Sequence, residues 1–354
     1  MRFLQILLLP FSYCYGWVMM LRNLFFKLGL LSSEKFDIPV ISVGNLSFGG
    51  TGKTPHIEYL IRLLRNRVLT ATLSRGYGRN TKGFILATPD STAENVGDEP
   101  LQFVKKFPDI QVAVDEKRVR GIYTLMEKIP HLGLVLLDDA FQHQWVKPGI
   151  SILLTDYHQM FTEDHVFPSG RLREFRSGAK RADIIIVTKT PKIFSPITKR
   201  RLKDELKPGP NQQLFFSYIT YGEPVPYNKD QDLSVLKKIN YILLFTGIAN
   251  DYPLQEELQR KCSKLSVLNF PDHHQYDMKD LEKIRSQFMD LPSQKKIILT
   301  TEKDAMRLKS PEFSNYLKDL PLFYIPIEIN FHEKDKMKFD KLITDYVEKN
   351  QRNR

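Results

Sequence analysis

The sequence of 354 residues predicts an α/β protein with a largely parallel sheet. Short apolar runs alternate with stretches of helical periodicity, which is typical of strand–helix–strand units. The composition is that of a folded chain, with 42% hydrophobic and 26% charged residues. The length is sufficient for two domains of ordinary size, each with its own core. We therefore expect two α/β domains rather than one compact domain.

The first thirty residues form an apolar segment. No charged residue occurs in residues 3–21, which lie between Arg2 and Arg22. This length is close to the minimum for crossing a bilayer, but Pro10 and several polar residues interrupt the segment, and the pattern after it resembles an interfacial helix. No small-residue cleavage site follows, which argues against a signal peptide. We expect residues 1–31 to form a membrane-associated helix, spanning or interfacial; a helix buried in the core is the alternative.

The next expected domain covers residues 32–218. Its apolar runs predict strands at residues 38–43, 68–73, 110–114, 134–137, 150–155 and 184–188. The stretches of helical periodicity between them predict helices at residues 53–65, 99–106 and 118–128.

Residues 219–238 are extended and rich in turn formers, so we expect them to link two domains. A smaller α/β lobe is expected at residues 239–320. Its predicted strands are residues 242–245, 265–268 and 297–300, and its predicted helices are residues 253–262 and 279–288. The closing residues 321–354 predict one return strand and a charged C-terminal helix.

A glycine-rich turn follows the first strand of the larger domain. Residues 49–54 read GGTGKT and open an amphipathic helix, which is the context of a P-loop. Glycine tolerates positive φ, so the backbone N–H groups of such a turn can surround phosphate oxygens at a helix N-terminus. The strict pattern has glycine where this chain has Ser47. The expected phosphate-binding residues are Ser47, Phe48, Gly49, Gly50, Thr51, Gly52, Lys53 and Thr54.

The P-loop predicts ATP and Mg²⁺ as ligands. Lys53 would neutralise the β- and γ-phosphates, and Thr54 would bind the metal. Asp138 and Asp139 end an apolar strand, where two carboxylates are costly without a nearby cation. Gln142, one helical turn further on, completes the expected metal set. As an alternative, the two aspartates cap a following helix.

The charge balance favours an anionic partner. The chain has 52 Lys and Arg against 41 Asp and Glu, a net charge of +11. Such a charge attracts nucleic acid, anionic lipid headgroups or phosphorylated substrates. The basic residues form no aromatic-studded stripe and no known nucleic-acid module, so we expect no nucleic-acid partner. Cys14 and Cys262 are the sequence's two cysteines, which argues against a disulfide framework and a structural zinc site.

Several motifs together resemble one family. In order, they are the N-terminal apolar segment ending LRNLFFKLGLL, then VGNLSFGGTGKTP, LSRGYGR, GDEP, DDAFQH, FPSGRLREF, RADIIIVTK, FTGIAND, FPDHHQY and TTEKDA, and the match covers nearly the whole chain. This order and spacing resemble the tetraacyldisaccharide 4′-kinases (lipid A 4′-kinase, LpxK) of Gram-negative bacteria. The family's nucleotide loop also tends to lack the first glycine, in agreement with Ser47. The resemblance implies a P-loop NTPase-like domain and a smaller lobe, joined by a two-stranded linker, with MgATP between them.

The resemblance also implies a reaction. The γ-phosphate of ATP would pass to the 4′-hydroxyl of a tetraacylated glucosamine disaccharide 1-phosphate, giving lipid IVA in lipopolysaccharide biosynthesis. The expected location is the cytoplasmic face of the bacterial inner membrane, with the membrane surface as partner and no obligatory protein partner. The family's catalytic carboxylate matches Asp98, and its histidine partner matches His273. Together with Lys53, these are the expected catalytic residues. Asp98 has a second interpretation, as the cap of the helix predicted from residue 99.

Arginines near these motifs are candidate substrate ligands. Arg75 follows a strand that we expect beside the P-loop strand, although an exposed arginine in a structural turn is an equal alternative. Arg171 and Arg173, with Arg118, are candidates for binding the substrate's 1-phosphate through bidentate contacts.

Two other functions remain as alternatives. A membrane-associated P-loop ATPase switch usually has a lysine where this chain has Phe48, which argues against it. A soluble small-molecule P-loop kinase would have its N-terminal helix in the core and would not require an acylated substrate.

Overall fold

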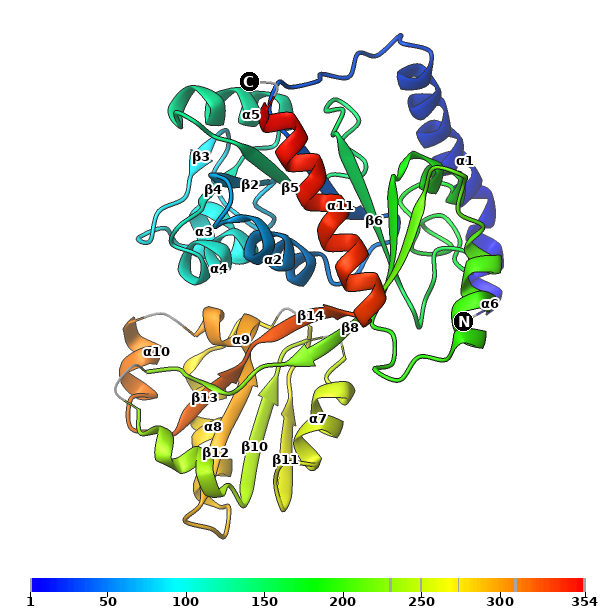
Figure 1. The fold of residues 1–354 in the computed structure, drawn as a ribbon. Helices are drawn as coiled ribbons and strands as arrows, with labels where there is room; N and C mark the ends of the chain where they lie inside the picture. The colour runs from blue at the N-terminus through cyan, green and yellow to red at the C-terminus, as the bar shows by residue number, and fades with distance from the viewer. Residues whose placement is uncertain (1, 229–230, 249, 273, 309–310, 353–354) are drawn as a thin grey trace. The chain divides into compact units, whose positions relative to one another are not determined.

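The computed structural model describes residues 2–228, 231–248, 250–272, 274–308 and 311–352 (Figure 1). The chain divides into two compact units. The first consists of Met1–Ile219 and Ile329–Arg354, and the second of Thr220–Glu328. The second unit is therefore inserted in the sequence of the first.

The first unit is built on a mixed sheet. Among the described residues its strand order is β14-β8-β7-β6-β1-β5-β2-β4-β3. The strand pairs from β8 to β4 are parallel, and β3 pairs with β4 antiparallel. The strands are β1 Val40–Asn45, β2 Thr70–Ser74, β3 Ile85–Leu86, β4 Gln111–Val114, β5 Leu134–Asp138, β6 Ile150–Asp156, β7 Ile184–Thr188, β8 Gln213–Tyr221 and β14 Ile327–Phe331.

Helices cover both faces of this sheet. They are α2 Lys53–Leu64, α3 Ala93–Val96, α4 Asp98–Lys106, α5 Arg118–Lys128, the 3-10 helix η1 Arg176–Arg181, α6 Pro196–Leu206 and α11 Glu333–Arg352. One apolar core joins α2, α4 and α11 to the sheet, with α11 drawn in red in Figure 1. The opposite face packs against α5 and α6. Burial on both faces explains why the central strands are continuously apolar.

The second unit has a five-stranded sheet of order β11-β10-β12-β13-β9 among the described residues. The strands are β9 Val225–Pro226, β10 Tyr241–Thr246, β11 Lys264–Asn269, β12 Lys296–Thr301 and β13 Leu322–Ile325. The helices are η2 Leu233–Lys238, α7 Tyr252–Gln259, α8 Met278–Met289, α9 Glu302–Arg307 and α10 Pro311–Tyr316. Only β9 is antiparallel to its neighbour in this described sheet.

The predicted α/β class with parallel-rich sheets is confirmed, and two local predictions are wrong. The closing apolar stretch forms two strands, because Pro326 lies between them and has no N–H group to donate to a sheet. Of these strands β13 belongs to the second sheet and β14 to the first. The strand before Arg75 is also not beside the P-loop strand, because β5 lies between β1 and β2.

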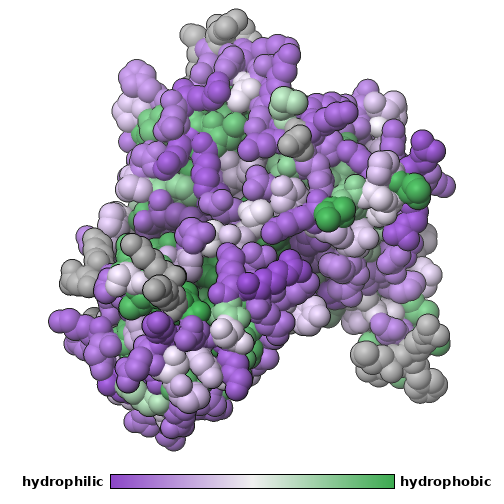
Figure 2. Space-filling view, turned by 60° about the horizontal axis from the view of Figure 1, so that its bottom comes forward, coloured by the Kyte–Doolittle hydropathy of each residue, from purple (hydrophilic) through white to green (hydrophobic). Residues whose placement is uncertain are grey.

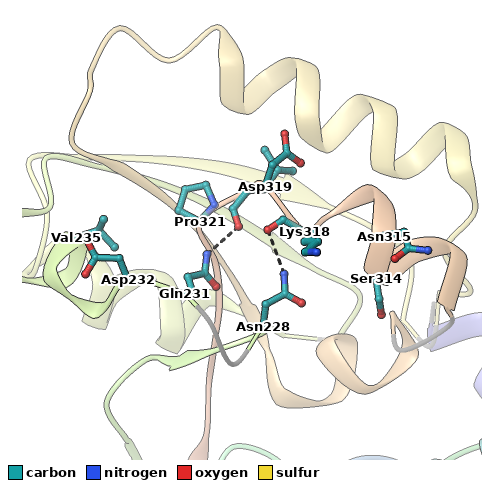
Figure 3. Close-up of a pocket in the computed structure, with 10 residues that line it drawn as sticks. Asn228, Gln231, Asp232, Val235, Ser314, Asn315, Lys318, Asp319 and Pro321 are labelled. Atoms are coloured by element: carbon teal, nitrogen blue, oxygen red, sulfur yellow. Dashed lines mark hydrogen bonds between the residues drawn. The ribbon is translucent and has the colours of Figure 1, made fainter.

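A pocket of about 500 Å³ lies in the second unit (Figure 3). Two of its amides contact backbone carbonyls: Gln231 Nε2 donates to Leu320 O at 2.7 Å, and Asn228 Nδ2 donates to Lys318 O at 3.5 Å. None of the site residues predicted from the sequence lines it. We assign these two amides a structural role.

The N-terminal helix α1, Arg2–Lys27, exposes apolar side chains. Phe11, Trp17 and Val18 are 65%, 63% and 67% exposed. The alternative of a helix buried in the core is therefore wrong. No helix among the described residues combines the length and apolarity that crossing a bilayer requires. The face of the molecule drawn in Figure 2 is mostly hydrophilic, with separate hydrophobic patches.

Polar contacts attach the other side of α1 to the first unit. The hydroxyl of Tyr15 donates to Arg173 O at 3.1 Å, and Arg22 Nη2 donates to Gln142 O at 2.8 Å. At Gly16 an added Cβ would lie 2.5 Å from the Phe175 ring, so the helix approaches closely there. These contacts orient the apolar side chains of α1 toward solvent.

Candidate functional site

The glycine-rich turn lies at the carboxyl end of β1, before α2. Gly49 has φ 110° and Gly52 has φ 84°, in the region that favours glycine. At Gly50 a Cβ would meet no atom within 4 Å, so this part of the turn has open space beside it. Since the N-terminus of α2 adds partial positive charge, the turn suits a phosphate ligand.

Side chains hold the carbonyl groups of this turn. Asn45 Nδ2 donates to Thr51 Oγ1 at 2.9 Å and lies 3.4 Å from Gly49 O. Lys189 Nζ donates to Gly50 O at 2.6 Å. The carbonyl oxygens of Gly49 and Gly50 are thus directed at Asn45 and Lys189, and Thr51 N donates to Gly49 O at 3.1 Å within the turn.

His56 holds the end of the turn. Its Nδ1 lies 2.7 Å from Gly52 O, and its Nε2 lies 3.0 Å from Ser217 Oγ. Burial lowers the pKa of His56 to about 4, so the ring is neutral at pH 7. With Nδ1 as the donor, Nε2 accepts from Ser217. The sequence analysis missed both His56 and Lys189. Ser217 and Gly50, the partners of His56 Nε2 and Lys189, are distant in sequence and form no motif with them, although Gly52 lies only four residues before His56.

The segment around residue 172 lies against the turn. Phe48 N donates to Arg171 O at 2.7 Å, and Arg173 N donates to Leu46 O at 2.7 Å. Ser47 pairs with Leu172 in an antiparallel bridge. The structure therefore brings the predicted substrate residue Arg171 next to the predicted phosphate-binding turn.

Two cations contact Asp139. Lys53 Nζ lies 3.7 Å from Asp139 Oδ1, and the Lys53 side chain is 13% exposed. Arg173 makes contacts of 3.0, 3.1 and 3.2 Å with the same carboxylate. The Arg173 guanidinium also lies 5.0 Å from the centre of the Phe48 ring. Asp139 is thus fixed beside the lysine of the turn.

Asp138 carries a buried carboxyl group. It ends β5 next to Val43 of β1, and neither carboxylate oxygen has a hydrogen-bond partner among the described residues. Burial raises the pKa of Asp138 to about 8, with a further rise from Glu99 and Asp139. Such a group requires a proton or a cation. Asp139 begins a turn and no helix, so the helix-capping alternative for these aspartates is wrong.

Glu99 joins this group and was missed as a site residue. Thr54 Oγ1 donates to Glu99 Oε1 at 2.7 Å, and the charge of Glu99 acts on Asp138. The available signal was the GDEP motif, where Glu99 follows Asp98. A hydroxyl and carboxylates suit Mg²⁺, which is usually bound by one or two carboxylates together with phosphates and water. A cluster of three or more His, Cys, Asp or Glu suited to a metal does not occur in the described part of the chain.

Gln142 and Arg118 support their neighbours. Gln142 Nε2 donates to Asn45 O at 2.8 Å, and its Oε1 accepts from Arg173 at 3.3 Å. Gln142 lies in a turn, so the expected helical turn from Asp138 is wrong. Arg118 is buried, donates to Asp115 O and lies 3.4 Å from Asp138 O. Burial lowers the pKa of Arg118 to about 10.

The remaining predicted residues lie at different places. Asp98 is exposed and is the first residue of α4, with Gly97 rather than Asp98 as N-cap, so the capping alternative is wrong. Arg75 is exposed, in the turn after β2. A Cβ at Gly97 would lie 2.9 Å from Tyr77 O, which places that turn against the start of α4. His273 lies outside the described residues.

In the comparisons with known proteins, one family matches nearly the whole chain. The family model described as tetraacyldisaccharide-1-P 4′-kinase (LpxK) matches residues 4–348. The tetraacyldisaccharide 4′-kinase of Phocaeicola vulgatus is 46% identical over 351 residues, covering 98% of this chain and 96% of its own. That of Flavobacterium johnsoniae is 45% identical over 353 residues, covering 99% of each chain. A crystal structure of LpxK from Aquifex aeolicus in complex with ATP has TM-score 0.74 and 27% identity, covering 97% of this chain and 99% of its own.

Proposed function

The chain belongs to the tetraacyldisaccharide-1-P 4′-kinase family, and on this basis we propose the reaction that it catalyses. It is an ATP-dependent kinase that transfers the γ-phosphate to the 4′-hydroxyl of a tetraacylated glucosamine disaccharide 1-phosphate, a lipid A precursor. The product is lipid IVA. The observation that carries this conclusion is the turn at residues 49–54, with Lys53 beside Asp139 and with Asp138, whose carboxylate has no donor among the described residues.

A transfer assay tests this function. Purified protein is incubated with Mg²⁺, the acylated disaccharide 1-phosphate and ATP labelled in its γ-phosphate. Mass spectrometry should detect one labelled phosphate on the non-reducing glucosamine. ATP hydrolysis without lipid phosphorylation would instead favour the ATPase switch, and equal transfer to a soluble, unacylated acceptor would favour a small-molecule kinase.

Residues 47–54 are the proposed triphosphate site. The positive φ of Gly49 and Gly52 and the open space beside Gly50 fit backbone approach to phosphate oxygens. Lys53, the first residue of α2, supplies the positive charge that phosphoryl transfer requires.

Thr54, Asp138 and Glu99 are the proposed residues for Mg²⁺. The buried oxygens of Asp138 and the Thr54 hydroxyl fit the metal's preference for oxygen ligands. Asp139 and Gln142 remain further candidates, although both are already in contact with Arg173. When bound, Mg²⁺ neutralises charge on the phosphates.

Asp98 is the proposed general base, with His273 as its proposed partner. Its exposure at the start of α4 fits contact with a substrate hydroxyl. The Asp98→Asn variant is expected to lose about 10² to 10⁴-fold in kcat, since that is the usual contribution of a general base. The matched control is Glu94→Gln, an exposed acid on the neighbouring helix α3, which should keep wild-type kcat. Wild-type kcat in Asp98→Asn would remove Asp98 from the catalytic residues.

Arg75 and Arg171 are the proposed substrate-binding arginines. The Arg75 side chain is exposed, and the Arg171 side chain is 43% exposed with one contact to Asp164. Both can therefore reach a phosphate by bidentate contact. Arg118 was predicted beside them, but its burial next to Asp138 favours a supporting role.

We also propose that α1 holds the kinase on the cytoplasmic face of the bacterial inner membrane. The exposed side chains of Phe11, Trp17 and Val18 form the apolar side of an interfacial helix, and the net charge of +11 favours anionic lipids. The substrate's acyl chains require access to a bilayer, and ATP is cytoplasmic.

Vesicle flotation tests this anchor. Changing Phe11, Trp17 and Val18 to serine should weaken binding to anionic vesicles about a hundredfold, because three large apolar side chains no longer leave water. The matched control is Ile193→Ser with Ile197→Ser, which removes two side chains that are 94% and 82% exposed elsewhere. Equal loss of binding in the control, or unchanged flotation of the α1 variant, would contradict the anchor.

A further inference from the structure

Lys189 has an unusual backbone conformation. It follows β7 directly and has φ 58°, in the left-handed region that a lysine rarely adopts. The backbone is fixed on both sides, since Tyr157 N donates to Thr188 O at 2.9 Å and Thr190 N to Ser217 O at 3.0 Å. Thr188 and Thr190 are buried. Such a conformation persists where the surroundings determine it, and it often serves a site.

The side chain of Lys189 extends from β7 to the glycine-rich turn. Its Nζ donates to Asp156 Oδ2 at 2.7 Å and to Gly50 O at 2.6 Å. Asp156 ends β6, the strand that lies between β7 and β1. These two charge-assisted hydrogen bonds therefore link the ends of β6 and β7 to the turn that follows β1.

Gly50 depends on this contact more than its neighbours do. No atom lies within 4 Å of a Cβ built on Gly50, so no packing holds that side of the residue, and Lys189 holds its carbonyl. If the Gly50 carbonyl rotates toward the phosphate, its oxygen repels the ligand and the N–H groups of the turn no longer converge. A lysine on that oxygen prevents the rotation.

We propose that Lys189, held by Asp156, is a positioning residue of the ATP site: it fixes the Gly50 carbonyl and thereby presents the N–H groups of the turn to the triphosphate. This inference rests on the proposed ATP-dependent function. It differs from the role of Lys53, because Lys189 acts through the backbone of the turn.

Lys207 provides the matched control. It also has a left-handed backbone, φ 44°, but it is exposed at the C-cap of α6, where that conformation is common. Positive φ alone is therefore not sufficient evidence of function. Lys189 and Lys207 share residue type and backbone class, and they differ in the contact with Gly50.

The experiment compares Lys189→Met, Lys189→Arg, Asp156→Asn and Lys207→Met with wild type. ATP affinity is measured by calorimetry with Mg²⁺ and a non-hydrolysable ATP analogue, and KM and kcat by phosphate transfer. Lys189→Met should weaken analogue binding and raise KM for ATP about tenfold, with kcat within about threefold, because the turn contacts phosphate before and during transfer. Lys189→Arg should restore part of the affinity, Asp156→Asn should show a smaller loss, and Lys207→Met should match wild type.

Other results would overturn the proposal. Wild-type ATP affinity in folded Lys189→Met excludes positioning, and a large loss of kcat at unchanged KM means that the lysine acts on the transition state instead. If Lys189→Met does not fold, wild-type affinity in both Lys189→Arg and Asp156→Asn overturns it. A wild-type protein that does not bind ATP overturns both this inference and the proposed function. If the wild-type protein binds ATP but does not phosphorylate the lipid, the assigned acceptor is overturned. The ATP affinities of the variants then still decide the role of Lys189.

Discussion

Replacing Lys53 with alanine is expected to lower kcat/KM for phosphoryl transfer at least about 10³-fold, since cationic groups at the transferred phosphate contribute that much. Lys53 begins α2, and its side chain is only 13% exposed, so its ammonium group is held near the turn with little freedom. Charge neutralisation and positioning supply most of the rate in phosphoryl transfer. Loss of this charge should therefore affect both ATP binding and the transition state.

The fold should tolerate this change. Asp139 loses the contact with Lys53 at 3.7 Å but keeps Arg173 at 3.0 Å, so the melting temperature should change little. Lys128→Ala is the control, since this exposed lysine ends α5 and is not one of the predicted site residues. It should keep wild-type kcat/KM. Activity of Lys53→Ala within tenfold of wild type would contradict the assigned phosphate site.

The Asp138→Asn variant is expected to be less active but more stable than the wild type. Its kcat should fall about 10² to 10³-fold, because the proposed metal site loses a charged ligand. The same change should stabilise the magnesium-free protein, by on the order of 2 kcal/mol, because a neutral amide replaces a buried carboxyl group that has no donor in the described part of the chain. Transfer assays measure the first effect, and thermal unfolding in a chelator measures the second.

Asp183→Asn is the matched control for this pair of effects. Asp183 precedes β7 and accepts a hydrogen bond from Ser151 N at 2.8 Å, so its carboxylate already has a donor. Its replacement should change neither the activity nor the magnesium dependence of ATP affinity. If Asp138→Asn keeps magnesium-dependent ATP affinity, Asp138 is not a metal ligand and its burial requires another explanation.

Local patterns predicted the elements of the fold well. The strand at residues 184–188 and the helix at residues 118–128 were predicted with the bounds that the structure has. Each depends on apolar periodicity within a few residues, which the sequence displays directly. The position of the strand before Arg75 was wrong, because strand order depends on long-range pairing, and β5 inserts between β1 and β2.

The candidate site residues were predicted only where a motif marks them. GGTGKT gave Lys53 and Thr54 as candidates, whereas Glu99 became a candidate only through its contact with Thr54. Lys189 contacts the turn from 139 residues away, so that no local pattern marks it, and His56, four residues after Gly52, lies just outside the GGTGKT pattern. The burial of Arg118 was also not predictable, since the sequence shows a charged residue and not the backbone carbonyl of Asp138 that it contacts.

The insertion of the second unit between β8 and β14 determines the order in which a nascent chain is completed. Residues 220–328 emerge from the ribosome before Ile329–Arg354, which carry most of β14 and all of α11. Until then the apolar surface that α2 and the sheet share with Phe339, Ile343 and Val347 is uncovered. The larger unit is therefore begun before the second unit and completed after it. While its core is exposed, the growing chain is most prone to aggregate.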